Sequence, residues 1–189
     1  MPTHHELSIP GVYLLEPQPF RDERGWFARY FCANEFRQTG REVRFVQFNH
    51  SSTKRRGSVR GLHLQLGTAA EDKLVRCVRG AVMDVMVDLR RGSPTFLRHE
   101  RVELSPDNGL AVFIPRGCAH GFQTLEDDTE LIYHHSNYYA PAHEAGLRFD
   151  DPRLGIEWPL PVADISDKDR GWPLLNTSFE GYGFDETPD

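Results

Sequence analysis

Short segments in which apolar and polar residues alternate recur through most of the chain, with turn residues between them. The clearest runs from Ala81 to Leu89, where every second residue is apolar and where Asp84 and Asp88 fall on the other face. A period of two sends neighbouring side chains to opposite faces of a β-strand. Because each such strand has an apolar face to bury, a long series of them predicts a sandwich or a jelly-roll barrel.

Several segments show enough of this pattern to be expected as strands, and Gly, Pro, Asn or Asp lies between many of them. They are Gly11–Leu15, Trp26–Tyr30, Phe45–His50, Ser58–Gln65, Lys73–Arg79, Ala81–Leu89, Glu100–Leu104, Leu110–Ile114, Phe122–Leu125 and Glu130–Ser136. A short helix is expected at Ala33–Gln38, and the proline-rich stretch 141–170 is expected to wrap the outside. We therefore expect an all-β jelly-roll barrel with a few short peripheral helices, and a loosely held tail from about residue 177.

The overall composition fits a single domain, residues 1–189, in a reducing compartment. Cys32, Cys77 and Cys118 are odd in number and far apart, which is not a disulfide framework. The N-terminus lacks a signal-peptide pattern, and no apolar run approaches the ~18 residues of a spanning helix, so we expect a cytoplasmic protein. A net charge of -6 argues against nucleic-acid binding and against polybasic binding to a membrane.

Two distant segments carry the polar residues expected inside the barrel. His63, Gln65 and Lys73, followed much later by His120, have a spacing that resembles the two motifs of the cupin superfamily. There, the motifs supply three His and one Glu to a divalent metal, but here Gln65 and Lys73 stand at two of those positions. An amide and an ammonium are poor ligands, so we expect no metal and no other cofactor, although a carboxylate from elsewhere could complete a metal site. A purely structural role for both histidines would bury many polar groups at a cost.

A longer series of segments, in unbroken order from Gly11 to Leu175, resembles one cupin-fold family, the dTDP-4-dehydrorhamnose 3,5-epimerases. The segments are Asp22–Phe27, Gln47–Ser51, Arg60–Gln65, Asp84–Arg90, Ser93–Phe96, Ile114–Gly117, His120–Phe122, Tyr133, Tyr138–Tyr139, Asp150–Pro152, Ile156–Pro159 and Ser166–Asp169. The resemblance implies an isomerase that inverts C3 and C5 of a nucleotide-linked 4-keto-6-deoxy sugar. The C–H bonds beside the keto group are acidic because the carbanion charge spreads onto oxygen, so the reaction needs a base on one face and a proton donor on the other.

The resemblance also implies catalytic roles, residue by residue. His63 is the implied base, Asp169 holds its tautomer and orientation, and Tyr133 is the acid on the opposite face. Lys73 is implied to stabilise the enolate oxygen. The residues alone leave other readings open: Tyr133 as strand packing, Lys73 as an exposed strand residue, and Asp169 as part of a solvated charged run together with Asp167.

The same resemblance implies a substrate-binding set and a homodimer. Guanidinium groups suit phosphate oxygens, and aromatic rings suit stacking on a nucleobase. The implied set is Arg24, Arg60 and Arg170 for the diphosphate, Gln47 and Asn49 for the nucleotide, Phe27 and Tyr138 beside the base, and His120 inside the cavity. In this family the N-terminal segment crosses to a partner subunit, so Arg24 and Phe27 are expected to serve the neighbour's site.

Other functions stay open at this point. An epimerase acting at C3 alone would share His63, Tyr133 and Asp169, and a 3,4-ketoisomerase of the same sugars is disfavoured by the Arg60–Gln65 motif. A metal-dependent cupin oxygenase would retain metal when purified without chelator. A non-catalytic sugar-nucleotide binding protein would bind tightly without exchanging a proton, and the joint presence of the four implied catalytic residues disfavours it.

One departure from the family pattern leads to a prediction about the nucleotide. The family motif Arg-Gly-x-Phe continues with one residue and then Glu, but Arg29 stands at that position, so a donor replaces an acceptor. Thymine presents an N–H at N3, whereas cytosine presents an unprotonated nitrogen. If Arg29 faces the base, a CDP-linked or other nucleotide sugar should be turned over as well as the dTDP-linked one. Parallel turnover assays measure this, and a preference for dTDP would show instead that Arg29 turns to solvent or joins the phosphate contacts.

Overall fold

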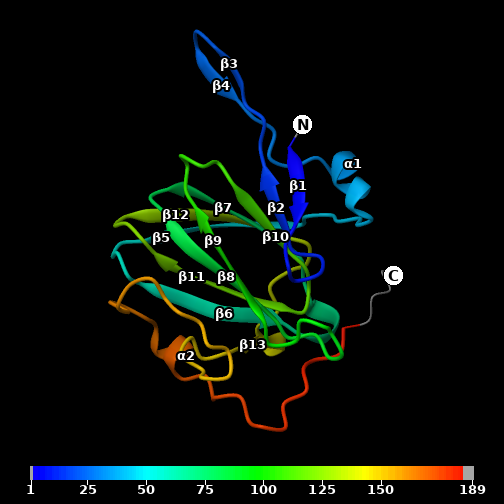
Figure 1. Ribbon diagram of the computed structural model, residues 1–189, viewed down its shortest axis with the longest axis vertical. Helices are drawn as coiled ribbons and strands as arrows, with labels where there is room; N and C mark the ends of the chain where they lie inside the picture. Colours follow the sequence, from blue (N-terminus) through cyan, green and yellow to red (C-terminus); the bar gives the residue numbers. More distant parts are fainter. Residues whose placement is uncertain (1, 185–189) are drawn as a thin grey trace.

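The computed structural model describes residues 2–184, which form two antiparallel sheets packed face to face (Figure 1). One sheet has the strand order β1-β2-β10-β7-β12-β5, and the other has the order β13-β6-β11-β8-β9. The strands are β1 Thr3–Glu6, β2 Tyr13–Glu16, β3 Phe20–Asp22, β4 Gly25–Phe27, β5 Gln47–Thr53, β6 Val59–Gln65, β7 Lys73–Arg79, β8 Val82–Asp88, β9 His99–Leu104, β10 Ala111–Ile114, β11 Cys118–Thr124, β12 Thr129–His135 and β13 Glu144–Gly146. The expected all-β jelly roll is confirmed.

Helical structure is short and peripheral, as expected. The helices are α1 Ala33–Phe36 and α2 Asp167–Arg170, with single 3₁₀ turns at Arg37–Thr39, Gly67–Ala69 and Pro141–His143. The helix expected at Ala33–Gln38 is therefore an α-helical turn that tightens into a 3₁₀ turn before Gly40. Within residues 2–184, no helix is long and apolar enough to cross a membrane.

The expected strand bounds differ most from the structure at β11, which is buried on both faces. β11 begins at Cys118 rather than at Phe122, and all of its residues are buried. Such a strand has no polar face, so its sequence lacks the period of two that would reveal its start. Three short strands were not expected at all: β1 and β13 at the sheet edges, and β3 in a separate hairpin with β4.

The central strands bury both faces because a second layer covers the barrel on each side. On β8, Met86 packs in the core between the sheets, whereas Val85 and Val87 pack under the C-terminal part of the chain. Asp84 and Asp88, on the other face from the valines, are also fully buried. The alternation along β8 therefore marks two different buried environments, and one of them is the barrel interior.

The stretch 141–170 wraps the outside of the five-stranded sheet, as the sequence indicated. Leu147 and Leu154 are buried against that sheet, and α2 ends the wrap beside β6 (Figure 1). The tail expected from about residue 177 continues along the same face, where the backbone of Tyr182 exchanges hydrogen bonds with Leu89 and Arg91. Residues 185–189 lie outside the described part of the chain.

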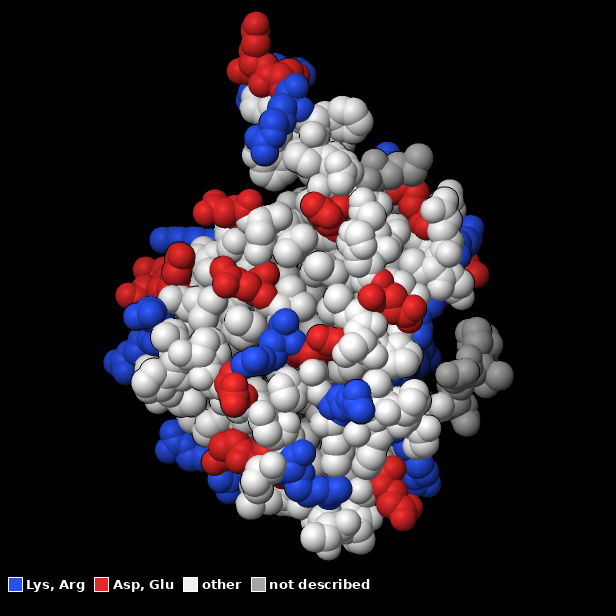
Figure 2. All heavy atoms as spheres, viewed as in Figure 1, with Lys and Arg blue, Asp and Glu red and all other residues white. Residues whose placement is uncertain are grey.

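The β3–β4 hairpin projects away from the barrel (Figure 1). Its aromatic side chains are exposed within this chain, with Phe20 at 75% and Phe27 at 70% of their accessible surface. Figure 2 shows that Lys and Arg side chains are interspersed with Asp and Glu over this face of the molecule, including the hairpin. An extended arm with exposed aromatic rings is typical of a segment that packs against another surface.

A close backbone approach between β6 and β11 sets the geometry of the barrel interior. A Cβ atom on Gly61 would lie 2.6 Å from the Cα of Gly121 and 2.7 Å from the carbonyl oxygen of His120, and Gly61 also has a φ of +112°. The register shifts at this point, between His120 and Phe122, and His63 pairs with His120 across the two strands. Only glycine permits both the contact and the backbone conformation.

We predict that Gly61→Ala lowers the free energy of unfolding by at least about 2 kcal/mol, because the new methyl group separates β6 from β11 and strains the backbone. Chemical denaturation measures the change. Gly183→Ala is the matched control, since a Cβ there meets nothing within 4 Å. Equal stability of the two variants would show that the barrel tolerates separation of these strands.

Candidate active site

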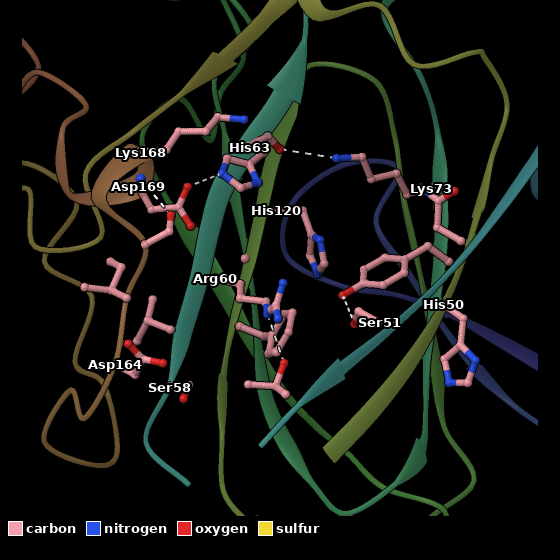
Figure 3. A pocket seen from close by; sticks show the side chains of 18 of the residues that line it. His50, Ser51, Ser58, Arg60, His63, Lys73, His120, Asp164, Lys168 and Asp169 are labelled. Carbon is pink, nitrogen blue, oxygen red and sulfur yellow. Dashed lines mark hydrogen bonds and ion pairs between the residues drawn. The ribbon is translucent and has the colours of Figure 1, made fainter. Parts of the chain in front are cut away.

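A pocket of about 530 Å³ opens between the two sheets (Figure 3). It is lined from β5, β6, β7, β11 and β12 of the barrel and from the segment that leads into α2. The lining residues are Asn49, His50, Ser51, Thr53, Ser58, Val59, Arg60, His63, Lys73, His120, Gly121, Phe122, Tyr133, His135, Asp164, Ile165, Ser166, Lys168 and Asp169. The four residues implied as catalytic by the sequence all lie in this one cavity.

His63 on β6 forms a close pair with Asp169 of α2. His63 Nε2 lies 2.6 Å from Asp169 Oδ1, and the second carboxylate oxygen accepts a hydrogen bond from the Gly61 N–H at 3.1 Å. A carboxylate can only accept, so it holds the imidazole proton on Nε2 and leaves the lone pair on Nδ1. The His63 side chain is 32% exposed and that of Asp169 only 5%, so the ring, not the carboxylate, is open to a ligand.

The local sequence explains why Asp169 alone in its charged run points inward. Ser166 caps the helix, its hydroxyl accepting a hydrogen bond from the Asp169 N–H, and this turn exposes Asp167, Lys168 and Arg170 while burying Asp169. Burial alone would raise the pKa of Asp169, but the hydrogen bonds and charge of His63 together with the Gly61 N–H hold it below its usual value. Asp169 is therefore an anion in the folded protein at neutral pH.

Lys73 begins β7 and extends into the pocket on the opposite sheet from His63. Its ammonium donates a hydrogen bond to the His63 carbonyl oxygen at 3.3 Å and lies 3.5 Å from Glu71 Oε1. Burial lowers the pKa of Lys73, and the charge of Glu71 opposes this shift. The ion pair with Glu71 favours the charged form, and an ammonium in a site of low dielectric interacts strongly with developing negative charge.

Tyr133 lies on β12, also in the sheet opposite His63. Its hydroxyl lies 3.1 Å from the hydroxyl of Ser51, and its ring meets that of His120 edge-on at a centroid distance of 6.1 Å. Burial raises the pKa of Tyr133 well above its usual value. The phenol therefore keeps its proton at neutral pH and can donate it.

His120 is fixed by a second histidine–carboxylate pair. Its Nε2 lies 2.7 Å from Asp84 Oδ1, and both side chains are buried. Figure 3 shows the His120 ring in the middle of the pocket, between His63 and the strand that carries Ser51. Asp84, on the inward face of β8, thus orients an imidazole on the pocket wall.

The position that carries a metal ligand in other cupins has a different task here. The Gln65 amide donates hydrogen bonds to the carbonyl oxygens of Ala69 and Tyr138 and accepts one from the Ala140 N–H. All three partners are backbone groups of loops at the end of the barrel. Among residues 2–184, no group of three or more His, Cys, Asp or Glu side chains is arranged to hold a metal ion.

The implied substrate-binding residues divide into two groups. Arg60, Asn49 and His120 line the pocket, and Arg60 is held there by Thr53 Oγ1 at 2.9 Å. Gln47 lies beside Asn49, with its amide nitrogen 3.3 Å from the Asn49 side-chain oxygen. Arg60, Asn49 and His120 therefore share the pocket with His63, whereas Gln47 lies outside its lining.

The remaining implied residues lie outside the cavity of this chain. Arg24 and Phe27 are exposed on the projecting hairpin, and Tyr138 is 67% exposed. Arg170 is exposed on α2, and Arg29 pairs with Glu35 of the same chain at 2.6 Å. Within a single chain, the hairpin residues and Arg29 are therefore not brought to the His63 pocket.

The pocket also contains functional groups that the sequence reasoning did not select. Ser51 and His135 contact Tyr133 and Glu71 contacts Lys73, both of the implied catalytic set, whereas Asp84 contacts His120 of the implied substrate-binding set. Strand parity could have indicated two of them, because Ser51 shares the inward face of β5 with Asn49, and His135 shares that of β12 with Tyr133. Alternation placed Asp84 on one face of its strand but gave no partner for it, and Glu71 precedes β7 and carried no such signal.

Comparison with known proteins gives the class and then the family. A family model described as dTDP-4-dehydrorhamnose 3,5-epimerase matches residues 6–177. The dTDP-4-dehydrorhamnose 3,5-epimerase of Salmonella typhimurium is 46% identical over 173 residues, which are 90% of this chain and 94% of the relative. A dTDP-4-dehydro-6-deoxyglucose 3-epimerase of a Streptomyces species is 39% identical, over 92% of this chain and 89% of the relative.

A solved structure agrees. The dTDP-4-dehydrorhamnose 3,5-epimerase of Bacillus anthracis, determined with TDP and PPi bound, superposes with a TM-score of 0.89 at 39% identity, covering 93% of this chain and 100% of that one. The barrel and its pocket are thus those of a cupin-fold epimerase, an isomerase. Since the family model spans most of the sequence, the chain belongs to the dTDP-4-dehydrorhamnose 3,5-epimerase family, as the sequence resemblance indicated.

Proposed function

We propose that this protein inverts C3 and C5 of a dTDP-linked 4-keto-6-deoxy sugar of the dTDP-4-dehydro-6-deoxyglucose type. The observation that carries the proposal is the placement of His63 and Tyr133 on opposite sheets of one pocket that Lys73 also lines. A sugar lying between the sheets presents one face to an imidazole and the other to a phenol. This is the arrangement that inversion through an enolate requires.

Proton abstraction falls to His63. Its Nδ1 lone pair takes the proton from carbon, and the electron pair of the broken C–H bond moves onto the carbonyl oxygen at C4. The imidazolium that forms is stabilised by Asp169, whose carboxylate lies 2.6 Å from Nε2. Asp169 acts through His63 and is a positioning residue.

The enolate oxygen is stabilised by Lys73. Its buried ammonium supplies a full positive charge where the negative charge develops, and burial strengthens that interaction. Tyr133 then donates its proton to the carbon from the opposite face, which inverts the centre. The resulting phenolate recovers a proton from solvent, and His63 releases one, so the site returns to its starting state.

The nucleotide half of the substrate extends past Arg60 and Asn49. We favour dTDP because the Bacillus anthracis relative binds TDP and because Arg29 pairs with Glu35 in this chain. The protein is proposed to act as a homodimer in which the projecting hairpin carries Arg24 and Phe27 to the neighbour's pocket. The exposure of the hairpin's aromatic rings supports this exchange, and the three free cysteines fit a cytoplasmic location.

The reaction can be tested by following hydrogen exchange at C3 and C5 of dTDP-4-dehydro-6-deoxyglucose in deuterium oxide. We expect deuterium at both carbons with the wild-type protein, and a loss of at least about 100-fold with His63→Ala, because the proposed base is removed. Tyr133→Phe should slow net epimerisation more than proton abstraction, since it removes only the donor. Nuclear magnetic resonance of the sugar reports both rates.

His99→Ala is the control, because His99 binds the Leu154 carbonyl oxygen outside the pocket. This variant should exchange the sugar hydrogens at the wild-type rate. Normal exchange in His63→Ala would show that another group is the base. Exchange at C3 alone would identify the function of the Streptomyces relative, a 3-epimerase. Tight binding without exchange at either carbon would indicate a non-catalytic binding protein.

Segment exchange can be tested by mixing two inactive variants. His63→Ala removes the proposed base from the pocket. The double variant Arg24→Ala, Phe27→Ala leaves the pocket intact and removes the two hairpin side chains. A hybrid dimer contains one site in which both parts are intact, so co-expression should restore about a quarter of wild-type activity, given random pairing in a symmetric dimer. No recovery in hybrid dimers isolated by two affinity tags would show that each hairpin serves its own chain or none.

A further inference from the structure

Glu71 takes no part in the mechanism above, yet it contacts two residues of the pocket wall. One carboxylate oxygen lies 3.5 Å from Lys73 Nζ, and the other lies 3.0 Å from His135 Nδ1. Glu71, Lys73 and His135 are 9%, 7% and 8% exposed, so all three groups are withdrawn from water. A buried carboxylate shared between a cation and an imidazole is costly unless both contacts are made, so it holds both partners in place.

The contacts of His135 fix its tautomer. The Asn49 side-chain nitrogen lies 3.3 Å from His135 Nε2, and an amide nitrogen can only donate, so Nε2 accepts and Nδ1 carries the proton given to Glu71. The His135 ring also stacks on Tyr133 at a centroid distance of 6.1 Å and an interplanar angle of 22°. A continuous series of polar contacts thus runs from Asn49 through His135 and Glu71 to Lys73.

This series crosses three neighbouring strands of one sheet. Asn49 lies on β5, His135 on β12, and Lys73 on β7, where it is in register with His135. It therefore connects the part of the pocket proposed to hold the nucleotide with the ammonium proposed to meet the enolate. Rigid strands keep such a series in one arrangement better than loops would.

Charged and titratable groups face Lys73 from every element around it. They are Glu71 before β7, Asp84 on β8, Glu144 on β13, His63 on β6, His120 on β11, and Tyr133 and His135 on β12. Two of the three carboxylates are engaged elsewhere, since Asp84 binds His120 and Glu144 binds Lys168 and Tyr139. Over residues 2–184, Glu71 is the carboxylate that forms an ion pair with Lys73.

We propose that Glu71 and His135 are positioning residues that keep the Lys73 ammonium charged and fixed at the pocket wall. The inference rests on the proposed function, because it concerns the group that stabilises the enolate. The two residues divide the task. Glu71 supplies the compensating charge, and His135 anchors the Glu71 carboxylate so that the charge stays beside Lys73.

The first test reads the charge of Lys73 directly and requires no substrate. The chain has only three lysines, Lys54, Lys73 and Lys168, so lysine labelled with ¹³C at Cε gives three resolvable signals, and Lys73→Gln assigns the one of interest. We expect Glu71→Gln to lower the titration midpoint of Lys73 by about one pH unit, as loss of a neighbouring opposite charge does. Glu71→Asp, which keeps the charge at a longer distance, should give a smaller shift.

Asp72→Asn is the matched control. Asp72 is the next residue and is equally buried, but its carboxylate pairs with Arg116 at 3.1 Å rather than with Lys73. This variant loses a buried carboxylate and should leave the Lys73 midpoint unchanged. If Glu71→Gln and Glu71→Asp both fold and neither moves the midpoint, or if Asp72→Asn moves it equally, the inference is overturned.

The second test reads the consequence for catalysis. In Glu71→Gln the alkaline limb of the kcat/KM profile should move about one pH unit toward acid, because the Lys73 ammonium loses its proton at a lower pH. His135→Phe keeps a ring beside Tyr133 but removes the anchor of the Glu71 carboxylate, so it should move the same limb toward acid by a smaller amount and lower kcat by about three- to tenfold. A merely structural role for the two residues would lower activity equally at every pH and would contradict the inference.

The two proposals fail separately. A wild-type protein that exchanges no hydrogen at C3 or C5 refutes the proposed epimerase function, whereas the Lys73 titration still reports whether Glu71 holds its charge. Conversely, normal hydrogen exchange at C3 and C5, together with an unchanged Lys73 midpoint in Glu71→Gln, would support the epimerase function and refute the role of Glu71.

Discussion

The contact between His63 and Asp169 joins two parts of the chain that are 106 residues apart, and the site depends on it. The Asp169 carboxylate also accepts from the Gly61 N–H, so it holds both the ring and the backbone of β6. It reaches that strand because the preceding segment is bridged to β6, with the Val59 N–H bound to the Asp164 carbonyl oxygen at 2.8 Å. The outer wrap therefore brings Asp169 to His63, so the proposed catalytic pair forms only when the wrap is in place.

Paired charges make a polar barrel interior possible. The four histidines of the described pocket each face a carboxylate: His63 with Asp169, His120 with Asp84, His135 with Glu71, and His50 with Glu130. The carboxylates paired with His63, His120 and His135 are buried, so these three pairs satisfy groups whose burial alone would destabilise the fold, whereas the pair of His50 with Glu130 is exposed. The division of the proposed base and acid between two sheets adds a geometric constraint, because the distance between them is set by sheet packing rather than by flexible loops.

The fold was predictable where the sequence of a strand alternates, even if both faces are buried as in β8, and less so where it does not. Alternation located β8 and β12 well, whereas the start of β11 was missed because Cys118–Thr124 is buried throughout. For the site, spacing alone singled out His63, Lys73 and His120, but Asp169 could be separated from Asp167 only by family resemblance. The reason is physical: the single turn of α2, capped by Ser166, buries Asp169 and exposes Asp167, and no periodic pattern in the sequence announces such a turn. The pairing of Glu71 with His135 joins two residues 64 apart and depends on strand register, which local sequence does not encode.

The three backbone hydrogen bonds of the Gln65 amide bear on how such a site can change over time. The same side chain donates to two carbonyl groups and accepts from one N–H, a combination that an imidazole cannot reproduce with its two ring nitrogens. A histidine at this position would free the loops around Tyr138 and Ala140 before it gained any ligand to share a cation with, because Lys73 would still repel one. A single Gln65→His substitution would therefore lose loop contacts without creating a metal site.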